Sequence, residues 1–270
     1  MNTARRWINW QIQKILPDPG QSYQRVELDQ VVFEEIEWRA DERVLDVGCY
    51  QGVSSSGIAD RVGSVVAVDI SPAALRGIRH ARISPACADG QALPFTGASF
   101  DTVFCHLVAN LFPQPAAAAR EFVRCLAPGG RIIISVSNLH APYQRLNRLM
   151  ERTWPRCNWA TLVRSQNHWP ARRWIEAFEG LGAALDRTYS CNLGWPLIPR
   201  LRGRWIIPNR LMWCWSRAAR RISALPVETV TPHFAAHDYL LVFVKRKNRR
   251  RVHDNSNRLN GRSPYIRAAE

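Results

Sequence analysis

Arg43-Val-Leu-Asp-Val-Gly-Cys-Tyr-Gln-Gly52 is the stretch that decides the fold. Its apolar segment Val44–Val47 predicts a buried β-strand, and two glycines, Gly48 and Gly52, predict a tight turn that opens a helix at about Val53. Glycines let a ligand approach the backbone closely, and free N–H groups at the start of a helix favour polar or anionic ligand groups. Glycine turns after strands are common, so the segments that follow determine what this turn binds.

Strands and helices alternate after this stretch. Further strands are predicted at residues 64–70, 83–88, 101–105, 131–137, 184–189 and 237–245, helices at residues 54–62, 72–80, 115–126 and 170–180, and a turn at 128–130. The strands lack a clean alternation of apolar and polar residues, which is typical of parallel strands buried on both faces. We therefore expect an α/β fold with helices on both faces of a parallel sheet.

The chain divides into three predicted parts. Residues 1–40 are expected to form an N-terminal helical lid, with a second helix over residues 22–39; the basic amphipathic segment at its start could instead lie on a bilayer surface. Residues 41–245 hold the α/β domain, which is interrupted by insertions at residues 138–167 and 191–231. Residues 246–270 are polar, basic and rich in turn residues, which predicts a disordered tail.

The basic residues are unevenly placed. The 270 residues carry a formal net charge of +15, eight arginines and no acid lie between residues 187 and 227, and six of the seven residues 245–251 are basic. This balance favours phosphates, acidic lipids or an acidic substrate, while general solubility also explains a basic tail. The arginine- and tryptophan-rich residues 208–222 fit an anionic membrane surface, a helix packed on its own domain or, as a third option, nucleic acid.

Several classes of protein are disfavoured. The seven cysteines include no Cys-x-x-Cys pair, so we expect reduced, buried cysteines and neither a zinc site nor a disulfide framework. No apolar run reaches about 18 residues, and no secretory signal is evident, which predicts a cytoplasmic protein able to touch a membrane from that side. His233 and His237 are four apart, but no third ligand is evident, so no metal is expected.

Acidic residues follow the next two predicted strands. Asp69 ends the second strand, 23 positions after Asp46, and Asp89 follows the third. In an open parallel sheet, ligands bind at the carboxyl ends of the strands near the switch in strand order. The Asp69 carboxylate can accept hydrogen bonds from both hydroxyls of a ribose, and the Asp89 carboxylate can accept one from an adenine amino group. NAD-type cofactors fit these features almost as well.

The segments downstream separate the two cofactor types. Asp89-Gly-Gln-Ala-Leu-Pro-Phe95, Ser99-Phe-Asp-Thr-Val-Phe104 and Leu126-Ala-Pro-Gly-Gly-Arg-Ile132 resemble class I S-adenosylmethionine (SAM)-dependent methyltransferases, specifically the small-molecule branch like methyltransferase type 11. The resemblance is close over residues 41–137 and moderate over residues 170–190 and the final strand. It implies a Rossmann-like, seven-stranded, mostly parallel sheet with an antiparallel last strand. It also implies helical insertions after strands five and six, which would cap an acceptor site.

The resemblance implies roles for individual residues. The loop that holds the methionine part of SAM matches Asp46, Gly48, Cys49 and Gly52. The ribose and adenine contacts match Asp69, Ile70, Asp89 and Gly90, and the lining of the methionine end matches His106. One position departs from the pattern: Tyr50 replaces the family's usual middle glycine, and its side chain would narrow the site.

The chemistry asks little of side chains, because proximity and orientation supply most of the rate, although a hydroxyl acceptor gains from a nearby base. His106 and His140 follow strands four and five and are the candidate catalytic bases, with a structural role as the alternative for each. We expect a SAM-dependent methyltransferase that methylates an oxygen atom of a small or lipid-like acceptor. If the basic segments bind lipid, this reaction would take place at an anionic membrane surface. The alternatives are a nucleic-acid-directed methyltransferase or binding protein that uses the basic tail, and a non-catalytic adaptor.

Overall fold

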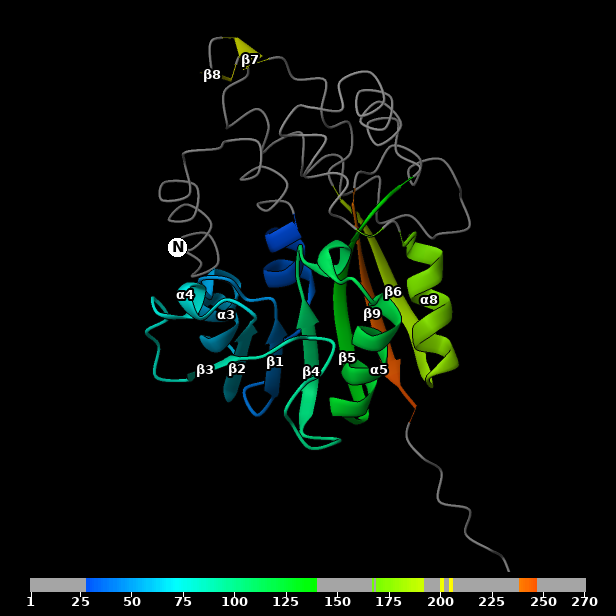
Figure 1. Ribbon diagram of the computed structural model, residues 1–270, viewed down its shortest axis with the longest axis horizontal. Helices are drawn as coiled ribbons and strands as arrows, with labels where there is room; N and C mark the ends of the chain where they lie inside the picture. The colour runs from blue at the N-terminus through cyan, green and yellow to red at the C-terminus, as the bar shows by residue number, and fades with distance from the viewer. Residues whose placement is uncertain are drawn as a thin grey trace, which may run out of the picture.

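The computed structural model describes residues 28–139, 167, 169–191, 200–201, 204–205 and 238–246. Seven strands form one sheet with helices on both faces (Figure 1). The strands of this sheet are β1 (Arg43–Val47), β2 (Ser64–Asp69), β3 (Ile83–Cys87), β4 (Phe100–Cys105), β5 (Leu126–Ser137), β6 (Ala183–Cys191) and β9 (Asp238–Lys245). The helical elements are η1 (Val31–Glu35), α3 (Val53–Ala59), α4 (Pro72–Leu75), η2 (Ala109–Leu111), α5 (Pro115–Cys125) and α8 (Ala171–Gly180).

The sheet has the order β3-β2-β1-β4-β5-β9-β6. β1 pairs in parallel with both β2 and β4, so the strand order reverses between β1 and β4. β9 runs antiparallel to both of its neighbours, β5 and β6. The predicted Rossmann-like fold, with seven mostly parallel strands and an antiparallel last strand, is confirmed. The arrows of β1, β4 and β5 all end at the same edge of the sheet, which is the upper edge in Figure 1.

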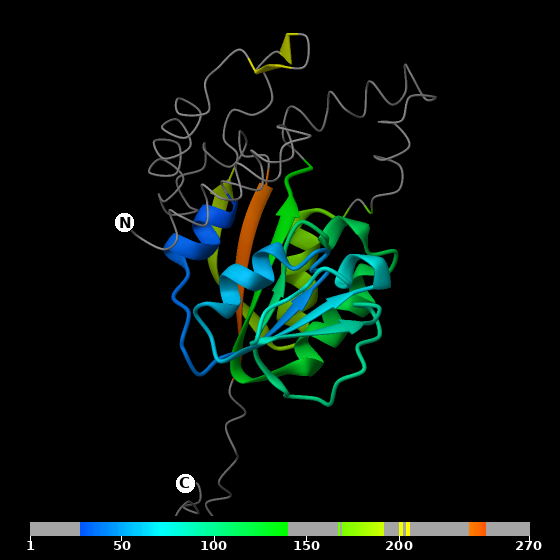
Figure 2. The ribbon, with the colours of Figure 1, turned by 90° about the vertical axis from the view of Figure 1, so that its left-hand side faces the viewer.

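Each face of the sheet carries its own apolar core. Phe122 of α5 and Phe178 of α8 pack on one face, while Val32 of η1 and Ile58 of α3 pack on the other. The blue helical segment that includes η1 and the green α5 lie on opposite sides of the sheet in Figure 2. Burial on both faces explains why the strands read as continuous apolar runs in the sequence.

Two helices are shorter than predicted. The helix expected over residues 72–80 ends at Leu75, because the N–H of Ile78 bonds to the Leu75 carbonyl at 3.1 Å in a tight turn. This turn places the Ile78 side chain in the core. The helix expected up to residue 39 ends at Glu35 as a short π-helix, and Ile36 is already extended. The other predicted helices and the predicted strands of the described part differ from the structure only at their ends.

The predicted turn at residues 128–130 lies inside β5, which begins at Leu126 rather than at Arg131. Leu126 pairs with Phe100 and Arg131 with Thr102, so the residues between them bulge out of the ladder. Gly129 has φ +81°, a backbone conformation that glycine adopts without strain. The glycines therefore serve a bulge within the strand, and the prediction of a separate turn before it was wrong.

Several predictions lie outside the described residues. They concern residues 1–27 of the lid, His140, the insertion at residues 140–166, the histidine pair His233 and His237, and the tail from residue 247 onward. Within the second insertion, the described pieces are two short strands, β7 (Arg200–Leu201) and β8 (Arg204–Trp205), paired antiparallel. The helix predicted over residues 208–222 of this insertion lies outside the described residues. No helix in the described ranges is both long and apolar enough to cross a bilayer.

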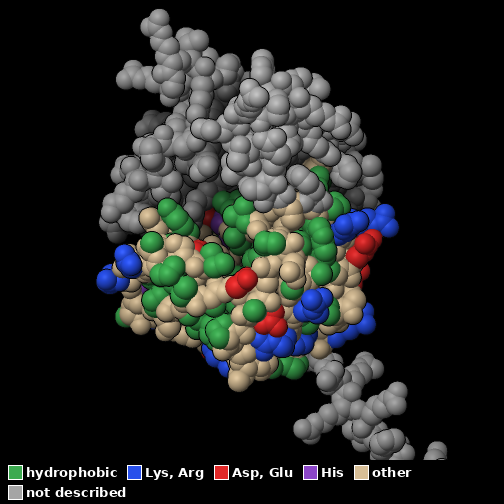
Figure 3. Space-filling model, viewed as in Figure 1, with side chains coloured by type: hydrophobic (Ala, Val, Ile, Leu, Met, Phe, Trp, Pro, Cys, Tyr) green, Lys and Arg blue, Asp and Glu red, His purple; other side chains and the backbone are tan. Residues whose placement is uncertain are grey.

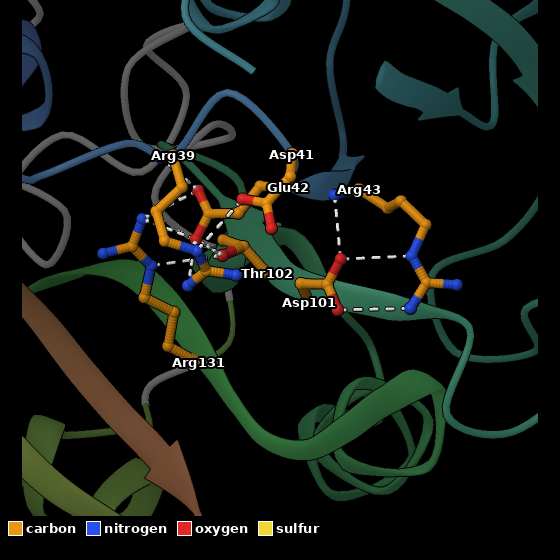
Figure 4. Close-up of polar contacts among 7 residues, drawn as sticks. All are labelled: Arg39, Asp41, Glu42, Arg43, Asp101, Thr102 and Arg131. Carbon is orange, nitrogen blue, oxygen red and sulfur yellow. Dashed lines mark hydrogen bonds and ion pairs between the residues drawn. The ribbon is translucent and has the colours of Figure 1, made fainter. Parts of the chain in front are cut away.

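A buried polar network fixes the amino ends of the central strands (Figure 4). The Glu42 side chain is 1% exposed and accepts from Arg131 Nη2 at 3.0 Å and from Thr102 Oγ1 at 3.3 Å. Arg131 Nε donates to Thr102 Oγ1 at 3.1 Å, and the Arg131 guanidinium lies over the Trp38 ring at 5.1 Å. Because Glu42 precedes β1 and Arg131 lies in β5, the network joins strands at the edge opposite the strands' carboxyl ends.

The end of α5 is tied to its neighbours through backbone carbonyls. Lys245 Nζ donates to the carbonyls of Val123 at 2.7 Å and Leu126 at 2.6 Å, which satisfies acceptors at the helix C-terminus. Arg124 donates to the carbonyls of Leu93 at 2.9 Å and Phe95 at 2.6 Å. The helix thereby holds both β9 and the loop that follows β3.

Candidate active site

A cavity of about 540 Å³ lies at the carboxyl ends of β1, β2, β3 and β4, beside the switch in strand order. The predicted site residues that line it are Asp46, Gly48, Cys49, Asp69, Ile70, Asp89, Gly90 and His106. Gly52 is not among the lining residues, and His140 lies outside the described part. Figure 3 shows acidic and histidine atoms, in red and purple, in a recess bordered by apolar side chains, with Lys and Arg at the sides and lower edge of the described surface.

The glycines of the site are required by protein packing. A Cβ atom at Gly48 would lie 2.5 Å from Val108 Cγ1, and the φ of Gly48 is +77°. A Cβ atom at Gly90 would lie 2.7 Å from Val47 Cγ1. The loop after β4 therefore packs directly against the glycine loop after β1. From sequence alone, the missing side chain of Gly48 is attributed to a ligand, whereas the Val108 side chain fills this space.

The backbone N–H groups of the glycine loop are already bonded within the protein. Those of Gly48 and Cys49 donate to the Val68 carbonyl at 2.8 and 3.0 Å, and that of Gly52 donates to the Cys49 carbonyl at 2.9 Å. The expectation that free N–H groups here would attract an anionic ligand group is wrong for these positions. The pairing of β1 with β2 supplies the acceptor at Val68, which explains the difference.

Three carboxylates converge on the cavity from three strands. Asp46 is 2% exposed and accepts from Ser55 Oγ at 2.5 Å. Asp69 accepts from the N–H groups of Tyr50 and Ser71, and Asp89 accepts from that of Gln91. A carboxylate oxygen has two lone pairs, so each can accept further bonds from a ligand. None of the described lining residues is Lys or Arg, which favours a cationic ligand over the phosphates of a dinucleotide.

Several large apolar side chains that line the cavity are exposed to solvent. Ile70 is 72% exposed, Tyr50 60% and Leu111 47%, and all three line it. Leu107 has φ +59°, and its N–H donates to Ser135 Oγ at 2.6 Å, which holds this strained backbone in place. An apolar wall with a few fixed polar groups suits a flat, apolar ligand group such as a purine ring.

His106 lines the cavity but is largely shielded from solvent. The residue is 8% exposed, and its ring stacks on Phe104 with centroids 5.5 Å apart. His106 Nε2 lies 3.3 Å from Asp29 Oδ1, an ion-pair distance, although neither ring nitrogen has a partner of hydrogen-bonding geometry among the described residues. Asp29 is 2% exposed and was missed by the sequence reasoning; the available signal was a carboxylate between apolar helix positions, Leu28 and Val31.

Cys49 is held as a neutral thiol. Burial raises the pKa of the Cys49 thiol, and the nearby carboxylates Asp46 and Asp69 raise this pKa further. A neutral thiol is neither a nucleophile nor a metal ligand at ordinary pH. The described ranges also hold no cluster of three potential metal-ligating side chains.

Residues 45–134, which contain this cavity's three acids and its glycine loop, match the family model of the methyltransferase domain. The match covers about a third of this chain, so residues 45–134 are similar to a methyltransferase domain. Among curated proteins, the chain is similar to a demethylmenaquinone methyltransferase of Corynebacterium kroppenstedtii, at 32% identity over 34% of this chain and 41% of the relative. It is also similar to a ubiquinone biosynthesis O-methyltransferase of Idiomarina loihiensis, at 35% identity over 36% and 43% of the two chains. The chain thus spans about two fifths of the length of these relatives.

Solved structures share the fold of the methyltransferase domain. A methyltransferase in complex with the Haloferax volcanii Trm112 activator has a TM-score of 0.59 and 17% identity, over 91% of this chain and 98% of that chain. A SAM-dependent methyltransferase from Thermotoga maritima has a TM-score of 0.57 and 12% identity, over 89% and 97% of the two chains. At these identities the likeness concerns the fold alone.

The methyltransferase domain implies SAM as its cofactor, and the cavity fits this molecule. SAM carries a positive sulfonium, a positive amino group and a carboxylate, and a lining with carboxylates and no described Lys or Arg suits its net positive charge. The exposed Ile70 and Leu111 offer an apolar surface for the adenine. The cavity volume of about 540 Å³ lies within the range of about 300–1,000 Å³ that is usual for small-molecule sites.

Proposed function

We propose that the protein is a SAM-dependent methyltransferase that acts on a small, lipid-like acceptor. The observation that carries this proposal is the convergence of Asp46, Asp69 and Asp89 on one cavity, within a methyltransferase domain and with no described Lys or Arg in the lining. This charge pattern supports a sulfonium cofactor and argues against a phosphate-bearing one.

The cavity residues divide the binding work among three strands. Asp46 near the end of β1, with Gly48 and Cys49 of the loop after it, holds the methionine part of the cofactor. Gly52 lies behind this lining and supports the loop through its N–H bond to the Cys49 carbonyl. Asp69 accepts the ribose hydroxyls, and Ile70 packs beside the adenine. Asp89 and Gly90 form the far wall of the adenine site. When bound, SAM supplies a methyl group made electrophilic by the positive sulfur; the protein contributes placement and exclusion of water.

The acceptor class is argued from the apolar wall and from relatives. Exposed Tyr50, Leu107 and Leu111 suit an apolar molecule. The names of similar proteins refer to demethylmenaquinone, ubiquinone biosynthesis and tocopherol, all lipid-like compounds. We propose oxygen as the methylated atom, with His106 accepting the hydroxyl proton and Asp29 stabilising the imidazolium that forms. His140 stays a second candidate base.

Titration calorimetry with S-adenosylhomocysteine (SAH) tests the cofactor part. We expect binding in the micromolar range by the wild type, and a loss of about 1–3 kcal/mol in the Asp69→Ala variant. Absence of binding by the wild type would contradict the proposal. Incubation of lipid extracts with labelled SAM then tests the acceptor part, because a methyl ether in the labelled product supports O-methylation and a carbon-bound label contradicts it.

Attachment to an anionic membrane stays a prediction, because the basic, tryptophan-rich residues that motivate it lie outside the described part. Flotation with anionic liposomes tests it, and a protein that does not float would contradict it.

The nucleic-acid alternative predicts a different result. In that case, removal of residues 246–270 would abolish activity, and activity would fall steeply with salt.

A further inference from the structure

Asn167 makes four hydrogen bonds with two separate parts of the chain. Its side-chain Nδ2 donates to the carbonyls of Ala109 and Phe112, both at 2.9 Å. Its backbone N–H donates to the Asn110 carbonyl at 2.7 Å. Its Oδ1 accepts from the N–H of Trp169 at 3.2 Å. Asn167 therefore satisfies three carbonyls of one short segment, which includes η2.

This segment is a wall of the cofactor cavity. Leu111 and Phe112 line the cavity, as does Val108 immediately before η2. The Val108 side chain also fills the space beside Gly48 in the glycine loop. Asn167 itself is not a lining residue. A change at Asn167 therefore reaches the ligand only through the position of this wall.

Asn167 has a rigid support behind it. It lies four residues before α8, and Trp169, to which it is bonded, packs edge-on against Trp174 with ring centroids 5.2 Å apart. Trp174 is 1% exposed and stacks on Phe178 in the core. A side chain anchored in this way can hold a loop in a fixed position, because its own support does not move.

We propose that Asn167 is a positioning residue of the cofactor site, which fixes the wall of residues 107–113 against the glycine loop. The proposal rests on the proposed function, because it names SAH as the ligand whose affinity the wall controls.

Binding of SAH by calorimetry tests the proposal in the full chain. We expect Asn167→Ala and the equal-sized Asn167→Asp to bind SAH about 2- to 30-fold more weakly than the wild type. Asn167→Asp keeps the acceptor for Trp169 and the backbone bond to Asn110, loses both side-chain bonds to the wall, and sets a carboxylate against the two carbonyls. Lys245→Met is the matched control. It removes two bonds to the carbonyls of Val123 and Leu126, which do not line the cavity, and should leave the affinity unchanged.

Hydrogen exchange of the free protein supplies a readout that needs no ligand. The amides of residues 110–112 should exchange faster in both Asn167 variants and at the wild-type rate in Lys245→Met. Unchanged exchange at these amides, or SAH binding by Asn167→Asp at wild-type strength, would overturn the proposal. If the wild type itself does not bind SAH, the proposed function fails, and the exchange result alone decides whether Asn167 fixes the wall.

Discussion

The backbone N–H of Tyr50 donates a hydrogen bond to Asp69 Oδ2 at 2.8 Å, which joins the loop after β1 to the end of β2. Tyr50 has φ +50°, a conformation that costs a non-glycine residue about 1–2 kcal/mol. The charged acceptor offsets part of this cost. The Tyr50 side chain is 60% exposed at the cavity, so a tyrosine occupies the position of the family's usual glycine without disturbing the core.

Asp69→Asn should weaken SAH binding by about 1–3 kcal/mol. An amide offers one acceptor oxygen where the carboxylate offers two, so either Tyr50 or Ser71 loses a partner and the ribose loses a charged one. Calorimetry measures the change. Asp60→Asn is the control, because Asp60 lies outside the cavity lining and pairs with His80 at 3.3 Å. Equal affinities for Asp69→Asn and the wild type would remove Asp69 from the ribose site.

Tyr50→Gly should be more stable than Tyr50→Ala by about 0.5–1 kcal/mol. Both variants lose the same exposed ring, but only glycine relaxes the positive φ of this position. Urea unfolding of the two variants compares their free energies. A more stable alanine variant would show that the backbone of Tyr50 is not strained. The hydrogen bond from Tyr50 to Asp69 would then not be compensating for strain.

Glu42→Gln should lower the free energy of unfolding by about 2–4 kcal/mol, since it leaves the half-buried Arg131 without its carboxylate. Burial lowers the pKa of Arg131 and Glu42 raises it, so the carboxylate offsets part of the cost of burying this charge. Glu37→Gln, on the exposed side of the same segment, should have little effect. SAH affinity should be unchanged because the network lies at the opposite edge of the sheet; weaker binding would contradict this separation.

Stability should fall in acid partly through Asp101 and Glu121. Hydrogen bonds from Arg43 and Arg124 lower the pKa of each carboxyl below its ordinary value, 3.8 for Asp101 and 4.5 for Glu121. The unfolded chain then binds more protons, so the contribution is present above these values and is lost as the pH falls through the lower folded pKa values. The pairs are partly exposed, so each contributes at most about 1 kcal/mol.

Unfolding midpoints measured between about pH 5 and pH 2 check this expectation. Asp101→Asn should flatten the fall of stability with decreasing pH. Asp41→Asn, a change at an 82% exposed carboxyl, serves as the control and should keep the wild-type slope. A slope in Asp101→Asn as steep as in the wild type would show that the Arg43 pair does not persist in solution.

Alkylation should distinguish Cys49 from Cys87. The Cys49 thiol is buried, and its pKa is raised by burial, whereas Cys87 is exposed. At about pH 8, iodoacetamide should modify Cys87 in the folded protein and Cys49 only after unfolding, because the thiolate is the reactive form. Peptide mass spectrometry reads both sites. Rapid labelling of Cys49 in the folded protein would contradict a closed, neutral thiol.

The placement of the acids could be predicted because it depends on short stretches of sequence. Asp46, Asp69 and Asp89 each lie at or just beyond a strand end that the apolar pattern marks, and parallel strands bring such ends to one edge. The same reasoning located the glycine loop. It could not show that the loop's N–H groups bond to the Val68 carbonyl, because that contact depends on how β1 pairs with β2.

Residues far apart in sequence account for the rest. Asp29 reaches His106 from a helical segment 77 positions earlier, and Asn167 reaches η2 from more than 50 positions later. Neither residue belongs to a motif, and an isolated Asp or Asn is usually a turn or surface residue. The Val108 contact with Gly48 was hidden for a related reason: glycine was attributed to ligand approach, whereas its space is filled by a distant side chain.

The packing of residues 28–36 shows that the folded domain begins well before residue 45, where the family match starts. Leu28, Val32 and Ile36 are buried against the same face of the sheet as Ile58, and Trp38 Nε1 donates to the Val32 carbonyl at 2.9 Å. A shortened protein that began at residue 45 would open this apolar face and remove the carboxylate beside His106. Such a truncation should aggregate, and any activity that it lost would say nothing about the chemistry of the residues it kept.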